Sequence, residues 1–184
     1  MKLNDLRIIN EMHIASSVYL HGGPAKLDGE KLKRGGRRGH DMGAIFFVPE
    51  SKDGYKYALG YAISRAPANW AIYRVTFNAS ENEIFDFSNS SHRMLAQKRL
   101  STSEFESWER SAARSGHLDW ASIDDELLED WGFKGVFLHE RSKRVMNSSA
   151  DIVSIGIFNA ADVNIIEVLK KSDILERMPE VFNN

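Results

Sequence analysis

The chain has 184 residues, of which 42% are hydrophobic and 27% are charged, with a formal net charge of −2 and no cysteine. These values are typical of one globular domain and exclude a disulfide framework, a thiolate nucleophile and a cysteine-based zinc site. The small net charge gives no global attraction to nucleic acid. The longest apolar run is far too short to span a bilayer, and no signal peptide is evident at the N-terminus. We therefore expect a soluble, cytoplasmic protein without membrane contact.

The first half of the chain shows an α+β pattern without regular alternation of strands and helices. Its expected elements are a short helix, a strand, a buried strand, a helix and a strand, over residues 3–12, 17–21, 44–48, 51–63 and 70–78. The strand over 44–48 is continuously apolar, which indicates burial on both faces. Ser51 and Asp53 are start signals for the helix that follows it. The first strand is expected to stop at Gly22-Gly23-Pro24.

The second half begins with a short strand or turn at 84–87 and then a helical insert at about 90–131. Within the insert, Ser101 to Glu104 form a capping box, and Ser122 precedes a helix that Gly132 ends. The remaining expected elements are three strands and a closing helix, over 133–139, 151–158, 163–168 and the residues after Lys170. No repeat or low-complexity linker divides the chain, so residues 1–184 are expected to form a single domain.

Charge of opposite sign is concentrated in two stretches. The basic stretch lies among glycines and contains Lys31, Lys33, Arg34, Arg37 and Arg38. Glycine backbone amides together with guanidinium groups can bind a pyrophosphate, and a flexible solvated loop is an equal alternative. The acidic stretch from Asp124 to Asp130 is expected to be solvated surface.

Three short motifs, in a fixed order, carry the functional prediction. The first is Tyr19-Leu20-His21-Gly22-Gly23, the second is Gly43-Ala44-Ile45-Phe46-Phe47 followed by a tyrosine-rich helix, and the third is Ile152 to Phe158. In this order they resemble the NAD-binding core of the ADP-ribosyltransferases, particularly the branch that uses His, Tyr and Glu. The resemblance implies an α+β fold with a split, strongly twisted β core, flanking helices and a pocket between its two halves.

The resemblance also implies roles for individual residues in the first two motifs. His21 would hold the ribose hydroxyls of NAD, and the Gly22 backbone would pair with the nicotinamide amide. Tyr57 or Tyr61 would stack on the nicotinamide ring. These two tyrosines are one helical turn apart, so both can face one pocket. Gly43 and Arg38, from the glycine-rich basic stretch and its end, are further candidates for binding NAD.

The third motif departs from the family at the position of its catalytic glutamate, where this chain has Ser154. The glutamate stabilises the oxocarbenium ion that forms as nicotinamide leaves, and serine contributes no negative charge. Losing such stabilisation raises the barrier by several kcal/mol, about a thousand-fold in rate. Glu140 and Asp151 are the nearby carboxylates that could compensate. The loop 141–150 occupies the place where the family recognises its acceptor.

The resemblance therefore predicts a mono-ADP-ribosyltransferase that uses NAD and a macromolecular acceptor, either a protein or a nucleic acid. Two alternatives stay open: a catalytically inactive domain of this fold that binds a nucleotide or a partner protein, and a structural domain with a filled pocket. The six histidines have no paired-ligand spacing, so no metal site is expected. Asp86, Ser88 and His92 are interpreted as a chance likeness to a catalytic triad.

Overall fold

The computed structural model describes residues 17–25, 43–141 and 151–182. They form a mixed α+β structure with one seven-stranded sheet in the order β4-β5-β6-β2-β1-β3-β7. The strands are β1 Tyr19–Pro24, β2 Ile45–Pro49, β3 Trp70–Phe77, β4 Ile84–Phe85, β5 Gly135–Arg141, β6 Asp151–Ile157 and β7 Val163–Leu169. The α-helices are α1 Lys52–Arg65, α2 Ser90–Arg99, α3 Thr102–Ala112, α4 Asp125–Asp130 and α5 Lys171–Arg177.

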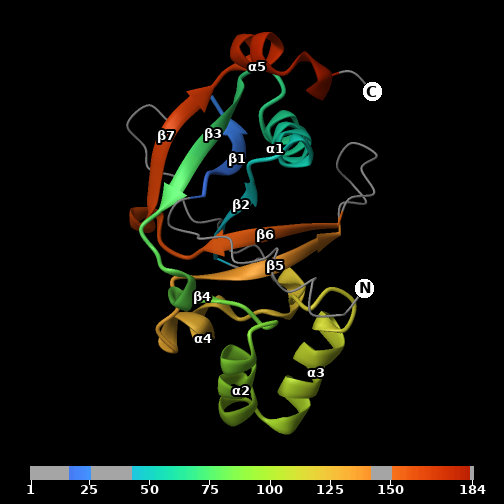
Figure 1. Cartoon of the computed structure of the whole chain (residues 1–184), viewed down its shortest axis with the longest axis vertical. Helices are drawn as coiled ribbons and strands as arrows, with labels where there is room; N and C mark the ends of the chain where they lie inside the picture. The colour runs from blue at the N-terminus through green and yellow to red at the C-terminus, as the bar shows by residue number, and fades with distance from the viewer. Residues whose placement is uncertain (1–16, 26–42, 142–150, 183–184) are drawn as a thin grey trace, which may run out of the picture.

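Strand β2 joins two parts of this sheet that run in different directions. Its C-terminal end pairs with β1 at Leu20↔Val48 and the neighbouring pair, whereas Ile45 to Phe47 pair with β6. Figure 1 shows β1, β3 and β7 inclined together in the upper part of the molecule, with β5 and β6 crossing below them. The sheet therefore changes direction along β2, and β1 and β6 lie on opposite edges of that strand.

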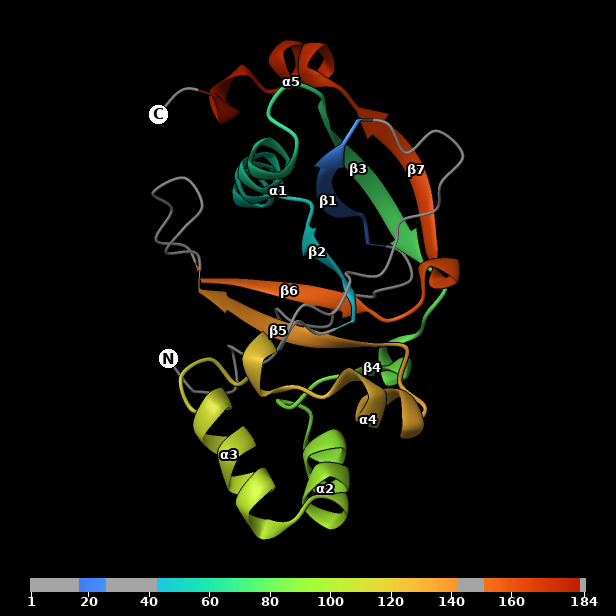
Figure 2. The ribbon, with the colours of Figure 1, turned by 180° about the vertical axis from the view of Figure 1, so that it is seen from behind.

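Helices cover the two parts of the sheet separately. Helix α1 lies beside β1 and β2, and α5 lies near it at the end of β7 (Figure 2). Helices α2, α3 and α4 lie below β5, where the aromatic rings of Phe85, Trp108 and Phe133 pack edge to face. Side chains alternate along β3 as its sequence predicts, with Tyr73 and Val75 in one core cluster and Ile72 in the cluster beneath α1.

The expected capping of the helices is largely confirmed. Ser51 caps α1 by accepting a hydrogen bond from the Gly54 amide at 2.9 Å. The capping box at Ser101 and Glu104 is present at the start of α3. Gly132, at φ +90°, follows α4 as predicted. Among the described helices, none is long and apolar enough to cross a bilayer.

Two expectations about the elements are wrong, and a third concerns residues that the structure does not describe. Strand β1 does not stop at Gly22, because its ladder with β3 continues to Pro24↔Trp70. Helix α4 is capped by Asp124 rather than Ser122, since the Asp124 side chain accepts from the Leu127 amide. The helix expected over residues 3–12 lies outside the described residues.

The acidic stretch is not entirely solvated surface, because Asp125 is only 3% exposed. Its carboxylate accepts a hydrogen bond of 3.1 Å from the backbone amide of Gly43. A buried carboxylate requires such a donor, since desolvation is otherwise unfavourable. The charge of Asp125 predicted an exposed side chain, whereas the hydrogen bond from the distant Gly43 amide explains why the carboxylate is buried.

Candidate functional site

Among the described strands, β1 pairs with β2 only as far as Leu20, whereas Ile45 to Phe47 of β2 pair with β6. In an antiparallel ladder a residue directs its N–H and C=O to one neighbour, and successive residues alternate. The Glu50 amide donates to the Val18 carbonyl at 3.0 Å, so the even-numbered residues of this segment face β2. Gly22 lies two residues beyond the last β1–β2 pair, which is Leu20↔Val48. We call the residues of β1 that follow this pair, 21–24, the open edge, because none of the described strands pairs with them on the β2 side.

The His21 ring lies at the open edge. Its Nδ1 is 2.8 Å from the carbonyl oxygen of Phe46, which lies on β2. Since a carbonyl only accepts, Nδ1 carries the hydrogen. Burial lowers the pKa of His21 by more than this hydrogen bond raises it, and the nearby charge of Arg65 lowers it further. The ring is therefore neutral at pH 7, and its Nε2 is an unprotonated hydrogen-bond acceptor.

Helix α1 packs directly on the backbone at Gly22. A Cβ atom at Gly22 would lie 1.9 Å from the Ala58 carbonyl oxygen and 2.9 Å from the Ala62 nitrogen. Only glycine fits this close approach of a helix to a strand. At Gly23 the nearest atom to an added Cβ would be His21 Nε2 at 3.5 Å, which is ordinary contact. A side chain would therefore clash at Gly22 but not at Gly23.

The two candidate tyrosines on α1 have different surroundings. Tyr57 is partly buried and packs against the apolar cluster beneath α1. The Tyr61 hydroxyl accepts a hydrogen bond of 2.9 Å from the Arg65 guanidinium. The guanidinium carbon of Arg65 is also 5.2 Å from the Tyr61 ring centroid. Both tyrosines lie on the helix that contacts Gly22, so the choice between them as a stacking partner stays open.

Ser154 lies on β6, opposite Leu138, and is 1% exposed. Its neighbours Ile155 and Ile157 belong to the cluster with Phe47, whereas Ile152 belongs to the cluster beneath α1. Side-chain alternation therefore places Ser154 on the α1 side of the sheet. The His21 ring, in contrast, contacts the rings of Phe47 and Tyr73 on the other side. The structure does not bring Ser154 and His21 together on one face.

The remaining predicted residues are placed only in part. Glu140 pairs with Ile152 in the β5–β6 ladder, two pairs beyond Leu138↔Ser154, and Asp151 pairs with Arg141. The Gly43 amide is engaged by Asp125. Arg38, the basic stretch around it and the loop 142–150 lie outside the described residues.

The polar cluster at the start of the helical insert does not have triad geometry. The Ser88 hydroxyl donates to the Asp86 carboxylate at 2.8 Å, and His117 Nδ1 lies 3.2 Å from the other oxygen of the same carboxylate. His92 Nδ1 accepts from the Asp86 backbone amide at 3.0 Å. In a catalytic triad the hydroxyl bonds the imidazole, which then bonds the carboxylate. Here both groups bond the carboxylate, so the cluster is structural.

Two features of this region were not anticipated from the sequence. Arg65 follows Tyr61 by four residues, a spacing that could have identified the pair. Asp125 had no local signal, because its partner Gly43 lies 82 residues away in the sequence. Within the described part of the chain, no group of three or more His, Cys, Asp or Glu could hold a metal ion.

Comparison with protein-family models, with curated proteins and with solved structures finds no match for this chain.

Proposed function

We propose that the protein has an ADP-ribosyltransferase-like fold, binds NAD and transfers one ADP-ribose unit to a macromolecular acceptor, a protein or a nucleic acid. The observation that supports this most strongly is the open edge of β1. There the Gly22 N–H and C=O face away from β3, and the His21 ring is held by Phe46. One N–H and one C=O on a strand complement the C=O and N–H of a carboxamide such as that of nicotinamide.

The protonation state of His21 suits contact with a ribose. Its neutral ring presents Nε2 as an acceptor, and a ribose hydroxyl is a donor. Tyr57 or Tyr61, on the helix that touches Gly22, would stack on the nicotinamide ring. In the transfer, the bond between ribose C1 and the nicotinamide nitrogen breaks with its electron pair going to nitrogen. An acceptor atom bonds C1 and releases its proton.

We expect a slow reaction, because Ser154 stands at the position of the family's catalytic glutamate. A hydroxyl can accept a hydrogen bond, but it supplies no charge to the cation that develops at C1. Its position on the sheet favours a second candidate function, a nucleotide-binding domain without catalysis. The observation behind this alternative is that Ser154 is 1% exposed and lies on the face away from the His21 ring.

Ligand binding is tested first. NAD at millimolar concentration should raise the melting temperature of the wild type by mass action, and His21→Ala should abolish the shift. Isothermal titration of NAD into both proteins checks the affinity directly. A folded wild type that shows neither a shift nor binding heat would refute the NAD proposal and favour an interaction domain.

Catalysis is tested with labelled NAD and a cell extract. Ser154→Glu should increase NAD cleavage if an anion near C1 is the missing element, and Ser154→Ala is its matched control. If Glu140 or Asp151 supplies the charge instead, Glu140→Gln or Asp151→Asn should abolish cleavage while Ser154→Ala changes little. Binding of NAD without cleavage in the wild type and in all four variants would leave the non-catalytic function.

A further inference from the structure

Arg65 occupies the same face of α1 as the residues that touch Gly22. It follows Ala58 by seven residues, which is nearly two full turns of an α-helix at about 3.6 residues per turn. It is in the last turn of α1, after which the chain turns to β3, whose first residue Trp70 pairs with Pro24. Arg65 therefore lies beside the end of the open edge that follows Gly22.

The Arg65 guanidinium is held in place by a neutral partner. Its hydrogen bond to the Tyr61 hydroxyl is 2.9 Å, and it lies over the ring of the same tyrosine. Four other arginines in the described residues have carboxylate partners: Arg74, Arg93, Arg110 and Arg177. Within the described residues, no carboxylate lies within ion-pair distance of Arg65, although its side chain is exposed.

An oriented but uncompensated guanidinium is suited to an anion. Its planar fork binds phosphate oxygens in a bidentate manner, and an aromatic face beneath it limits its rotation. The positive charge also acts on the open edge, because it contributes to the lowered pKa of His21. The contact of Ala58 and Ala62 with Gly22 places the last turn of α1, and with it Arg65, beside the strand that carries His21.

We propose that Arg65, oriented by Tyr61, binds the pyrophosphate of a dinucleotide whose nicotinamide riboside lies at the open edge. This inference rests on the proposed function, and it adds a residue that selects phosphorylated ligands. Tyr61 then acts as a positioning residue for Arg65, which leaves Tyr57 to stack on the nicotinamide ring.

The test compares ligands with and without phosphate. In calorimetric titrations, Arg65→Gln should weaken binding of NAD and ADP-ribose by about 10- to 100-fold, the value of a charge-assisted hydrogen bond. Binding of nicotinamide riboside should stay within about two-fold or improve slightly, since that ligand is a cation. Tyr61→Phe keeps the ring but removes the hydroxyl, and it should weaken NAD binding by a smaller factor.

Arg99→Gln is the matched control for charge. Arg99 also lies over an aromatic ring, 5.7 Å from the Trp131 centroid, but it belongs to α2 in the helical layer. The substitution Arg99→Gln should leave NAD affinity unchanged. Equal losses of NAD affinity in Arg65→Gln and Arg99→Gln would mean that only the net charge of the protein matters, and they would overturn the inference.

The proposed function and the inference can fail separately. Wild type that binds NAD, with Arg65→Gln within two-fold of it, overturns the role of Arg65 and leaves the NAD proposal intact. Inorganic pyrophosphate is the second probe. Binding of pyrophosphate that depends on Arg65, without binding of NAD, refutes the NAD proposal and supports the phosphate site. Binding of neither ligand overturns both.

Discussion

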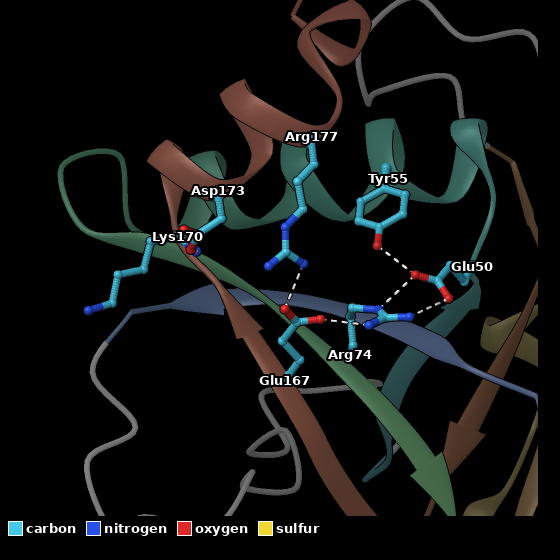
Figure 3. A network of polar contacts seen from close by, with 7 residues as sticks. All are labelled: Glu50, Tyr55, Arg74, Glu167, Lys170, Asp173 and Arg177. Carbon is cyan, nitrogen blue, oxygen red and sulfur yellow. Dashed lines mark hydrogen bonds and ion pairs between the residues drawn. The ribbon is translucent and has the colours of Figure 1, made fainter.

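Two arginines on the α1 side of the sheet differ in how their charge is compensated. Arg74 on β3 lies between Glu50 and Glu167, with nitrogen–oxygen distances of 2.7 Å and 2.6 Å to these two carboxylates. Figure 3 shows Arg177 completing this network from α5. Arg65, in contrast, has a neutral tyrosine as its partner. We call the first group the ionic network.

The ionic network connects elements that are distant in the sequence. Glu50 follows β2, Glu167 lies on β7 and Arg177 lies on α5, and Tyr55 of α1 donates to Glu50 at 2.6 Å. Burial raises the pKa of Glu50, but its hydrogen bonds with Arg74 and Tyr55 outweigh this and lower it. Every charge in the network therefore has a partner of opposite sign within it. Arg65, in contrast, has no carboxylate partner among the described residues, and its guanidinium donates to the Tyr61 hydroxyl.

The largest expected effect concerns the contact between α1 and the open edge. Gly22→Ala would place a Cβ 1.9 Å from the Ala58 carbonyl oxygen, so helix and strand must separate. We expect a loss of at least about 3 kcal/mol in the free energy of unfolding, at the upper end of overpacking penalties. Gly23→Ala is the matched control, and it should change stability by less than about 1 kcal/mol. Urea denaturation measures both, and similar values for the two variants would contradict the close contact.

A smaller effect is expected from breaking the ionic network. Arg74→Met leaves Glu50 and Glu167 without their shared partner, and it should lower the free energy of unfolding by less than Gly22→Ala does, because solvent screens partly exposed ion pairs. NAD affinity should not change, whereas Arg65→Gln should lower affinity and leave stability nearly unchanged. Urea denaturation and calorimetric titration of both variants would test whether Arg74→Met lowers only the stability and Arg65→Gln lowers only the NAD affinity. A loss of affinity in Arg74→Met equal to that in Arg65→Gln would remove the distinction between the two arginines.

Local signals predicted most of the elements around both regions. The Ser51 cap, the apolar pattern of β2 and the alternation of β3 depend on neighbouring residues, and the structure confirms the elements they predicted. The continuation of β1 past Gly22 was missed because pairing with β3 overrides the tendency of glycine to end a strand.

The site could be predicted only where its residues are close in sequence. His21 and Gly22 were identified from one motif, and the open edge lies at that motif. The contact of Gly22 with Ala58 and the burial of Asp125 depend on packing between distant segments, which a single sequence does not reveal. Whether Ser154 shares a face with His21 depends on the pairing of β1, β2 and β6, and side-chain alternation places the two residues on opposite faces of the sheet.

The smallest expected effect is a difference in how acid weakens the two regions. The pKa of His21 is lowered from its ordinary value of 6.5, and that of His92 is lowered as well, in both cases mainly by burial. As the pH falls below 6.5, the unfolded chain takes up these protons before the folded protein does. The free energy of unfolding therefore decreases until the pH reaches the folded pKa values.

The ionic network should respond only at lower pH. The pKa of Glu50 is lowered from 4.5, so its stabilisation is present above 4.5 and is lost as the pH falls through the folded value. Urea denaturation at pH values from 7.5 to 3 should therefore show two separate decreases. His21→Gln should reduce the first decrease, while Arg74→Met should reduce the second. NAD affinity should fall in the first range alone, because a proton on His21 Nε2 removes the acceptor that a ribose hydroxyl needs. An affinity that stays constant until the network titrates would show that His21 does not contact the ligand.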